Sequence, residues 1–225
     1  MESMYQQLMQ LPLFQGVGTE KIAGLVEKIP FHFLKFHNGD TIISQGDPCT
    51  HVKFVVSGQV KTETQFRHLK VTMHQTLSAP NVIGPNFLFG RDTTAPYTVT
   101  AHDTCGILQL LKSDYLKVLQ SDKVFLFNIL NYLSLASQKA NTSLLAIQRG
   151  TVREKLAFLI EMMASHKSSD IELTYQQKDL CRLLSTQRNA LVRALEEMAE
   201  QHLIEYTSTR LRVLDKKSLL ARVGQ

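Results

Sequence analysis

A cluster of side chains able to contact nucleic-acid bases lies in the segment 180–195, which contains Arg188, Asn189 and Arg193 and no acidic residue. An arginine guanidinium can donate two hydrogen bonds to guanine, and an asparagine amide can pair with adenine. Apolar residues recur in this region at helical spacing, which leaves Asn189 and Arg193 on the opposite side of the predicted helix. Such a helix fits the major groove of DNA. Its inward stripe consists of Leu191, Leu195 and Met198.

Two short helices joined by a tight turn are predicted to position these side chains. Thr174 is expected to cap the first helix, which runs through Gln177. The tripeptide 184–186 forms the turn, after which Thr186 or Gln187 caps the second helix. The apolar side of the first helix is formed by Leu180, Leu183 and Leu184.

A β-hairpin is predicted after the second helix. The stretches 203–206 and 211–214 are apolar and flank the polar turn 207–210. Two short helices and a hairpin of this kind make a winged helix-turn-helix. The alternative is an ordinary helical hairpin whose arginines are merely solvated. In the DNA-binding interpretation Thr186, Gln187 and the first helical amides suit phosphate, and the wing adds salt-sensitive contacts from Arg210 and Arg212.

A heptad-spaced stripe is found in the region 121–149. The spacing is typical of two helices packed against each other, so we expect one long helix that forms a homodimer. Ser121 or Asp122 is available as its N-cap. The expected dimer seam consists of Leu126, Leu130, Leu133, Ser137, Ala140, Leu144 and Ile147.

The long helix has a second apolar face. Phe125, Phe127 and Ile129 lie off the seam and are expected to pack on the chain's own β region. The alternative for the seam itself is the same packing, with no dimer. After the long helix, Thr151 and Glu154 have the spacing of a capping box, which predicts that a new helix begins there.

Residues 30–110 have the pattern of a β domain. Short apolar or alternating stretches are separated by turn sequences rich in Gly, Pro, Asn and Asp, which is typical of a sandwich, barrel or jelly roll. We therefore expect an α+β fold. Its three parts are a β-roll sensor domain over 1–120, a dimerisation helix over 121–149 and a DNA-binding winged helix-turn-helix over 150–225.

The composition excludes several classes of protein. The 225 residues are 44% apolar and 20% charged, a mix that can bury a core. No apolar run approaches the roughly 20 residues that span a bilayer, and the start does not resemble a signal peptide, so we expect a cytoplasmic protein. Cys49, Cys105 and Cys181 are too widely separated to suggest a metal site. No phosphate-loop or nucleophile-elbow motif is present, so we expect no enzyme.

The order of these parts resembles the catabolite activator and fumarate-nitrate reductase regulator (CRP/FNR) family of bacterial transcription regulators. The resemblance runs from Leu13 to Leu220. The stretches 39–47 and 52–61 look like the family's cyclic-nucleotide-binding β-roll signature, and 180–195 matches its helix-turn-helix.

This resemblance implies a homodimeric transcription regulator that binds an inverted-repeat operator in duplex DNA and cooperates with RNA polymerase. The family's three base-contacting positions fall on Arg188, Asn189 and Arg193. Members that depend on cyclic AMP commonly have glutamate at the middle position, so Asn189 implies a different half-site sequence.

The ligand cassette departs from the family pattern. Relatives that bind cyclic AMP hold the ribose hydroxyl with the glutamate of a Gly-Glu pair and the phosphate with the arginine of an Arg-Ser pair. Here those positions are Pro85 and Ala95–Pro96, and the base-contacting threonine of the long helix falls at Ala140. Alanine cannot make the charge-assisted pair that a buried phosphate needs, which argues against cyclic AMP as the effector. The candidate effector pocket consists of Gly84, Pro85, Asn86, Ala95, Pro96, Tyr97, Ala140 and Asn141.

The effector therefore stays open at this stage, and no cofactor or metal is predicted. Clustered cysteines for an iron–sulfur cluster are absent, whereas the eight histidines leave a haem sensor possible in principle. Two other classes of function compete with DNA binding. One is an interaction module with the cyclic-nucleotide fold that does not bind DNA, and the other is a small-molecule-binding protein with an incidental helical tail.

Overall fold

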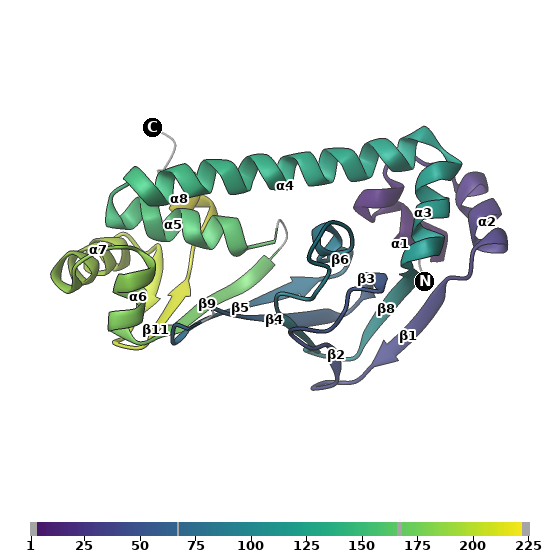
Figure 1. Ribbon diagram of the computed structural model, residues 1–225. Coiled ribbons are helices and arrows are strands. Elements are labelled where there is room, and N and C mark those ends of the chain that lie inside the picture. The colour runs from purple at the N-terminus through teal and green to yellow at the C-terminus, as the bar shows by residue number, and fades with distance from the viewer. Residues whose placement is uncertain (1–3, 67, 166–167, 222–225) are drawn as a thin grey trace. The chain divides into compact units, whose positions relative to one another are not determined.

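The structure is a computed structural model in which residues 4–66, 68–165 and 168–221 are described (Figure 1). The chain divides into two compact units. The first consists of Met1–Lys61 and Leu77–Ala136, and the second of Thr62–Thr76 and Ser137–Gln225. Residues 62–76 come from the middle of the expected sensor domain, yet they group with the C-terminal part of the chain.

The first unit is a β-roll with helices at its ends. Its strands are β1 (His32–Phe36), β2 (Thr41–Ile43), β3 (His51–Ser57), β6 (Asn81–Ile83), β7 (Thr98–Ala101), β8 (Cys105–Leu111) and the start of β4 (Gln59–Gln65). One sheet has the order β1-β8-β3-β6, and the other places β7 between β4 and β2. The helices are α1 (Met4–Met9), α2 (Thr19–Lys28), α3 (Lys112–Ser121) and the first part of α4 (Lys123–Arg149), with single 3-10 turns η1 (Pro12–Phe14) and η2 (Pro85–Phe87).

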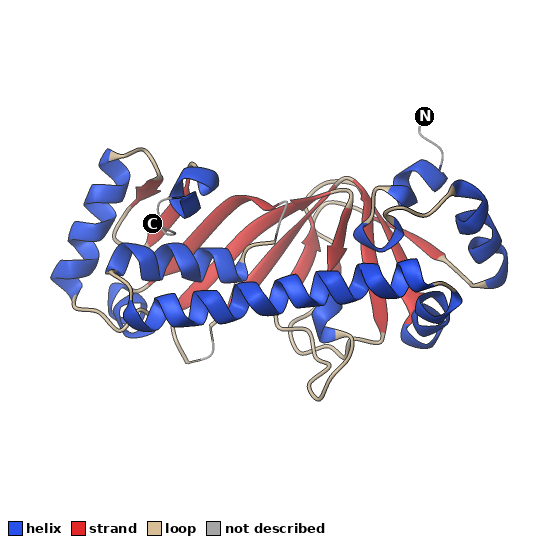
Figure 2. Cartoon of the chain, turned by 90° about the horizontal axis from the view of Figure 1, so that it is seen from above, coloured by secondary structure: helices blue, strands red, loops and turns tan. Residues whose placement is uncertain are grey.

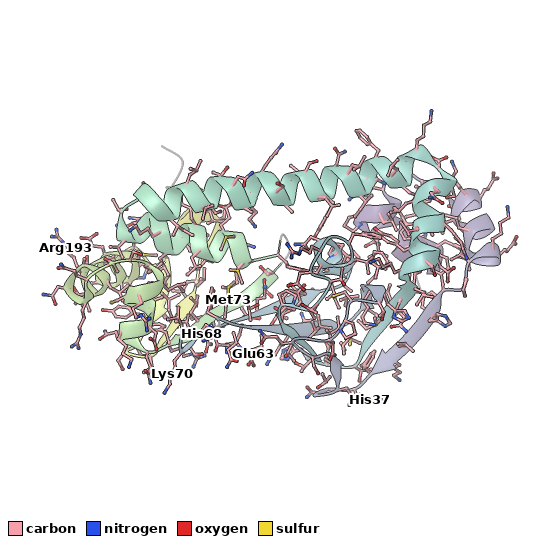
Figure 3. The ribbon with its side chains drawn as sticks, in the orientation of Figure 1. His37, Glu63, His68, Lys70, Met73 and Arg193 are labelled. Atoms are coloured by element: carbon pink, nitrogen blue, oxygen red, sulfur yellow. The ribbon has the colours of Figure 1, made fainter. Side chains whose placement is uncertain are left out.

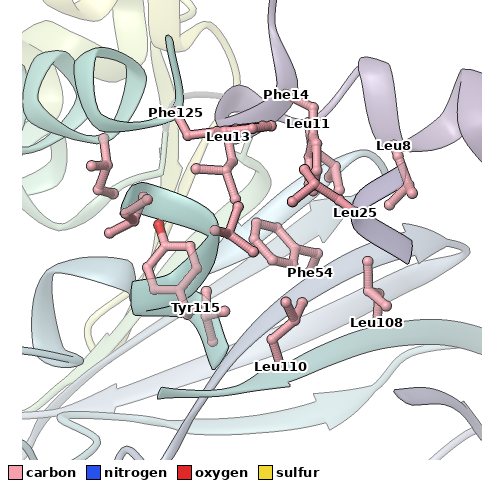
Figure 4. Close-up of a cluster of buried hydrophobic side chains, with 14 of the residues drawn as sticks. Leu8, Leu11, Leu13, Phe14, Leu25, Phe54, Leu108, Leu110, Tyr115 and Phe125 are labelled. Atoms are coloured by element: carbon pink, nitrogen blue, oxygen red, sulfur yellow. The ribbon is translucent and has the colours of Figure 1, made fainter. Parts of the chain in front are cut away.

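Strand β3 separates two apolar cores of this unit. Val52 and Phe54 face the helices, where the rings of Phe14 and Phe125 meet edge to face at 5.7 Å between centroids (Figure 4). Val55 belongs to the second core, inside the roll. Because successive side chains of a strand alternate between its faces, β3 contributes to both cores.

The second unit is a winged helix-turn-helix to which a β-hairpin adds two strands. Its sheet has the order β10-β11-β9-β5-β4. Its elements are the end of β4, the start of β5 (Val71–Ser78), the end of α4, α5 (Val152–Met163), β9 (Ser168–Tyr175), α6 (Gln177–Leu183), α7 (Arg188–Glu200), β10 (Ile204–Tyr206), β11 (Arg210–Val213) and α8 (Lys216–Ala221). The α+β fold class, with a roll and a winged helix, is confirmed.

The long helix is one unbroken element, as Figure 2 shows. The Asp122 side chain accepts a hydrogen bond from the Val124 amide at 2.7 Å, so Asp122 is the predicted N-cap. The capping box of the next helix is also confirmed, because Thr151 and Glu154 each bond the other's backbone amide. No helix in the described part of the chain is long and apolar enough to cross a membrane.

The elements that the sequence analysis did not predict include α2, α3, α8 and β9. The last one corrects a prediction, because Thr174 lies within β9 and does not cap the first helix of the helix-turn-helix. Ile171, Leu173 and Tyr175 are all buried, so the segment alternates with the period of a strand. Gln176 precedes α6 instead, and its side chain makes no cap.

Candidate nucleic-acid interface and effector cavity

The turn between α6 and α7 is tight and held by backbone hydrogen bonds. Ser185 adopts the left-handed region at φ 48°, and the Thr186 amide donates to the Cys181 carbonyl at 2.9 Å. Lys155 on α5 donates from Nζ to the Leu184 carbonyl at 3.2 Å, which satisfies one of the last carbonyls of α6. The predicted turn at 184–186 is thus present, and it fixes where α7 begins.

Helix α7 has one buried and one exposed side. Arg188, Asn189 and Arg193 are exposed, and 82% of the Arg193 side chain is accessible, directed away from the body of the unit (Figure 3). The predicted inward stripe is buried and packs in the core of the winged helix. The faces of the helix therefore agree with the sequence analysis, while base contact by the three polar residues stays a prediction. The buried stripe consists of Leu191, Leu195 and Met198.

The charges on α7 are unevenly distributed along its axis. Arg188 and Arg193 occupy the first half of the helix, and the second half carries Glu196, Glu197 and Glu200. Arg193 Nε donates to Glu197 Oε1 at 3.0 Å, in an exposed pair of the kind that adds little stability. Since the helix dipole also favours anions at the N-terminus, the first half of α7 is the end suited to DNA.

The positions expected to contact phosphate surround this N-terminus. Gln187 is the N-cap residue, but its side chain makes no hydrogen bond with the helix. The first amides of a helix have no partner within it, so a phosphate oxygen can accept from them. Thr186 is half-buried and Gln187 is exposed, which leaves both able to reach a phosphate.

The wing arginines are engaged within the unit. Arg210 bonds Glu172, and Arg212 bonds Asp170 at 3.3 Å; both acidic residues are on β9, the strand next to β11. The sequence analysis treated these arginines as free to contact phosphate, because β9 and its acids were missed. A phosphate must therefore compete with two ion pairs at the wing, which corrects the expected strength of these contacts.

The hairpin of residues 62–76 supports the start of the helix-turn-helix. The Gln176 amide donates to the Lys70 carbonyl at 2.9 Å, and the Lys70 amide donates to Oδ2 of the buried Asp179 at 3.2 Å. Met73 of the same hairpin is buried in the core of the unit, and Figure 3 labels it with Lys70. The hairpin thus holds the first turn of α6 in place. No sequence signal pointed to this arrangement.

The β-roll contains a cavity of about 250 Å³. Five of the eight predicted pocket residues line it, namely Gly84, Pro85, Ala95, Pro96 and Tyr97. Asn86 is exposed and does not line the cavity. Ala140 and Asn141 belong to the second unit, so their place in the effector site stays a prediction.

The wall formed by residues 93–97 has no free donor where the family pattern has its phosphate-binding arginine and serine. The Ala95 amide donates to the Asp47 carbonyl at 2.8 Å, the Ala95 carbonyl accepts from the Gly46 amide at 2.8 Å, and Pro96 has no amide hydrogen. Residues 93–95 are therefore paired with residues 46–49 in the wall of the cavity.

Sequence reasoning missed the polar end of the cavity, which comes from β3 and the residues before it. Cys49, Thr50, His51 and Lys53 all line the cavity. Lys53 Nζ donates to Gln109 Oε1 at 2.6 Å, and burial lowers the pKa of its ammonium group. Burial likewise lowers the pKa of His51 and raises that of the Cys49 thiol. The signal was the alternation of β3, in which Lys53 shares a face with Val55 of the inner core.

Helix α4 exposes apolar side chains along the predicted seam. Leu126, Leu130 and Leu144 are exposed, whereas Leu133 and Ile147 are half-buried against the cores of their own units. The remaining seam positions, Ser137 and Ala140, are exposed.

The off-seam contacts of α4 agree with expectation in two of three cases. Phe125 and Ile129 are buried in the core of the first unit. Phe127 is 64% exposed, so the prediction that it packs on the β region is wrong. It lies two residues from Phe125, about 200° around the helix, and therefore points away from that core.

No group of three His, Cys, Asp or Glu side chains in the described residues could hold a metal ion.

Comparison with known proteins identifies both halves of the chain. Residues 33–122 match the model of the cyclic nucleotide-binding domain, and residues 154–222 match that of the Crp-like helix-turn-helix domain. No curated protein sequence gives a significant match.

Among solved structures, the catabolite activator protein of Thermus thermophilus aligns over 94% of this chain and 97% of its own, with 20% identity and a TM-score of 0.52. The sensor domain of the transcriptional regulator DNR of Pseudomonas aeruginosa covers 58% of this chain and 85% of its own, with 17% identity and a TM-score of 0.49. At 20% identity the likeness to the Thermus thermophilus protein concerns the fold alone. Because a cyclic nucleotide-binding domain precedes a Crp-like helix-turn-helix in one chain, the protein belongs to the CRP/FNR family of DNA-binding transcription regulators.

Proposed function

We propose that two copies of the chain pair along α4 and place two α7 helices against one DNA duplex, each contacting bases with Arg188, Asn189 and Arg193. The observation that carries the proposal is the division of α7 into a buried apolar side and an exposed side bearing these three residues. A two-fold symmetric dimer requires an inverted repeat, with half-sites about one helical turn, ~34 Å, apart.

Contacts to the DNA backbone would orient α7 in the groove. The N-terminal amides of α7, with Thr186 and Gln187 beside them, are suited to bind one phosphate. Arg210 and Arg212 are placed to contact phosphates from the wing once their acidic partners on β9 are displaced. Such contacts make the affinity fall steeply as the salt concentration rises.

Selection of bound sequences from random duplex DNA by the full-length protein tests base contact. The wild type is expected to enrich an inverted repeat. Arg188→Ala and Arg193→Ala should each lower discrimination at one base position by about 1–3 kcal/mol. Arg91→Ala is the matched control, because Arg91 is exposed in the first unit. If the Arg188 and Arg193 variants select the same sequences as the wild type, these side chains do not contact bases.

The homodimer part of the proposal rests on the exposed leucines of α4. Leu130 is 52% exposed on the predicted seam, and burial against a second copy would remove this apolar surface from water. Leu130→Asp should give monomers in analytical ultracentrifugation and lower DNA affinity by more than tenfold. Leu135→Asp is the matched control, because Leu135 is 65% exposed but lies off the seam. A Leu130→Asp protein that stays dimeric would contradict the seam.

The cavity of the roll is proposed as the effector site, and an effector would act by binding one arrangement of the DNA-reading helices more tightly than another. The effector is not a cyclic nucleotide in this proposal, because the wall at Ala95 and Pro96 offers no partner for a phosphate. Titration calorimetry with cyclic AMP should show affinity no tighter than millimolar, and a micromolar dissociation constant would contradict this. RNA polymerase is the further partner that family membership leads us to expect on DNA.

A further inference from the structure

The cavity of the roll has a single cationic end. Lys53 and Gln109 are opposite each other in the register of β3 and β8, on the inner face that also carries Val55 and Ile107. The hydrogen bond to Gln109 uses one of the three donors of the Lys53 ammonium group, which leaves two for another acceptor. No acidic side chain in the described part of the chain forms an ion pair with Lys53.

The other polar groups of the cavity do not add positive charge at neutral pH. Burial and the charge of Lys53 lower the pKa of His51, which favours the neutral ring. His51 Nδ1 lies 2.8 Å from Thr50 Oγ1, in a hydrogen bond that also occupies the hydroxyl. Burial raises the pKa of Cys49 and so keeps its thiol protonated. Among the described lining residues, Lys53 is therefore the one cation.

The rest of the wall is mainly apolar, apart from one carboxylate. Asp47 also lines the cavity, but it is exposed and its Oδ2 accepts from the Ser44 amide at 2.8 Å. A ligand with a second negative charge would find no second cation among the described lining residues and would be repelled by Asp47. The apolar wall residues are Ile42, Ile43, Val52, Ile83, Pro85, Phe87, Leu88, Ala95 and Pro96, and Tyr97 adds an aromatic ring with a neutral hydroxyl.

We propose that this cavity binds a small monocarboxylate with an apolar body, with the carboxylate on Lys53 and the body against the wall of β2, β6 and η2. The proposal rests on the proposed function of the cavity as the effector site. A carboxylate carries the single charge that one lysine can match, and a charge-assisted hydrogen bond is stronger than a neutral one. At about 250 Å³ the cavity lies just below the usual range for small-molecule sites, so the ligand is smaller than a nucleotide.

The test compares acids with their uncharged amides. Full-length protein is titrated by calorimetry with hexanoate, benzoate and phenylacetate, and with hexanamide, benzamide and phenylacetamide. At least one acid should bind at least tenfold more tightly than its amide. Lys53→Met keeps the length of the side chain and should abolish this preference. Lys61→Met, an exposed lysine of β4 in the same unit, should leave it unchanged.

Three results would overturn the proposal: equal binding of every acid and its amide, no binding of any of them, or a preference that survives in Lys53→Met. If Lys53→Met does not fold, Lys53→Gln removes the charge while keeping a donor to Gln109 and is assessed in the same way. Sequence selection on the same preparation separates this result from DNA binding. A protein that selects an inverted repeat but does not prefer acids contradicts only the carboxylate site, whereas a protein that binds no DNA contradicts the proposed function.

Discussion

The outer side of α7 and the cavity of the roll are both surfaces for a ligand, but they are built in different ways. The side chains on α7 belong to one helix, and their directions follow from residue spacing and from the buried stripe behind them. The cavity is lined by residues from three separate stretches of the chain, around 42–53, 83–88 and 95–97. The first surface depends on local periodicity, and the second depends on how distant loops come together.

The largest expected effect is a difference in stability between variants on the two sides of α7. Leu195→Ala removes a fully packed side chain from the core of the second unit and should destabilise that unit by about 2–5 kcal/mol. Arg193→Ala changes an exposed side chain whose only ion pair in the described residues is a surface pair with Glu197, so its effect on unfolding should be about 0.5 kcal/mol or less.

Denaturant unfolding followed by circular dichroism measures both variants. Leu195→Ala should lose stability to unfolding but keep base discrimination at a permissive temperature. Arg193→Ala should keep its stability but lose base discrimination. This pair of results would show that one side of α7 stabilises the unit and the other contacts bases. If the two variants are equally destabilised, Arg193 also has a structural role that the fold does not explain.

Sequence analysis was accurate where neighbouring residues determine the structure. The turn at 184–186, the wing hairpin and the capping box of Thr151 and Glu154 are all local patterns, and the structure contains them. Strand β9 was missed although its apolar residues alternate, because Thr174 was interpreted as a helix cap and the strand's partners, β5 and β11, are remote in sequence. The same cause hid the ion pairs of Arg210 and Arg212 from the sequence analysis.

The cavity was predicted only in part, and for a related reason. The family pattern located its wall at residues 84–85 and 95–97, where the motif itself can be aligned. The alternation of β3 places Lys53 on the same face as Val55, but the sequence does not show which face becomes the interior of the roll. The register of β3 with β8 decides this, and register is a long-range property.

The second prediction concerns Gly84, whose place in the cavity wall requires the absence of a side chain. Its φ is 49°, and a Cβ at this position would come within 2.7 Å of the Tyr97 hydroxyl oxygen. Gly84→Ala should therefore destabilise the first unit by about 1–3 kcal/mol and disturb any ligand binding there.

Gly16→Ala is the matched control for this variant. Gly16 also has a positive φ, 75°, but a Cβ added there would meet no described atom within 4 Å. Thermal unfolding should show a larger loss of stability for Gly84→Ala than for Gly16→Ala. Equal losses would mean that backbone conformation alone accounts for the glycine and that the contact with Tyr97 has no energetic role.

The smallest expected effect tests the one part of the DNA surface that sequence analysis described incompletely. Glu172 holds Arg210 of the wing, so Glu172→Gln should free this arginine for phosphate while keeping a similar side-chain shape. A surface ion pair contributes about 0.2–1 kcal/mol to stability, so removing the competition from Glu172 should raise DNA affinity only a few-fold at low salt. The plot of log affinity against log salt concentration should become steeper by about one released counterion. Base discrimination should not change. Fluorescence anisotropy across a series of salt concentrations measures both quantities, with Arg210→Ala expected to shift them in the opposite direction. If Glu172→Gln leaves the slope unchanged, Arg210 does not contact phosphate.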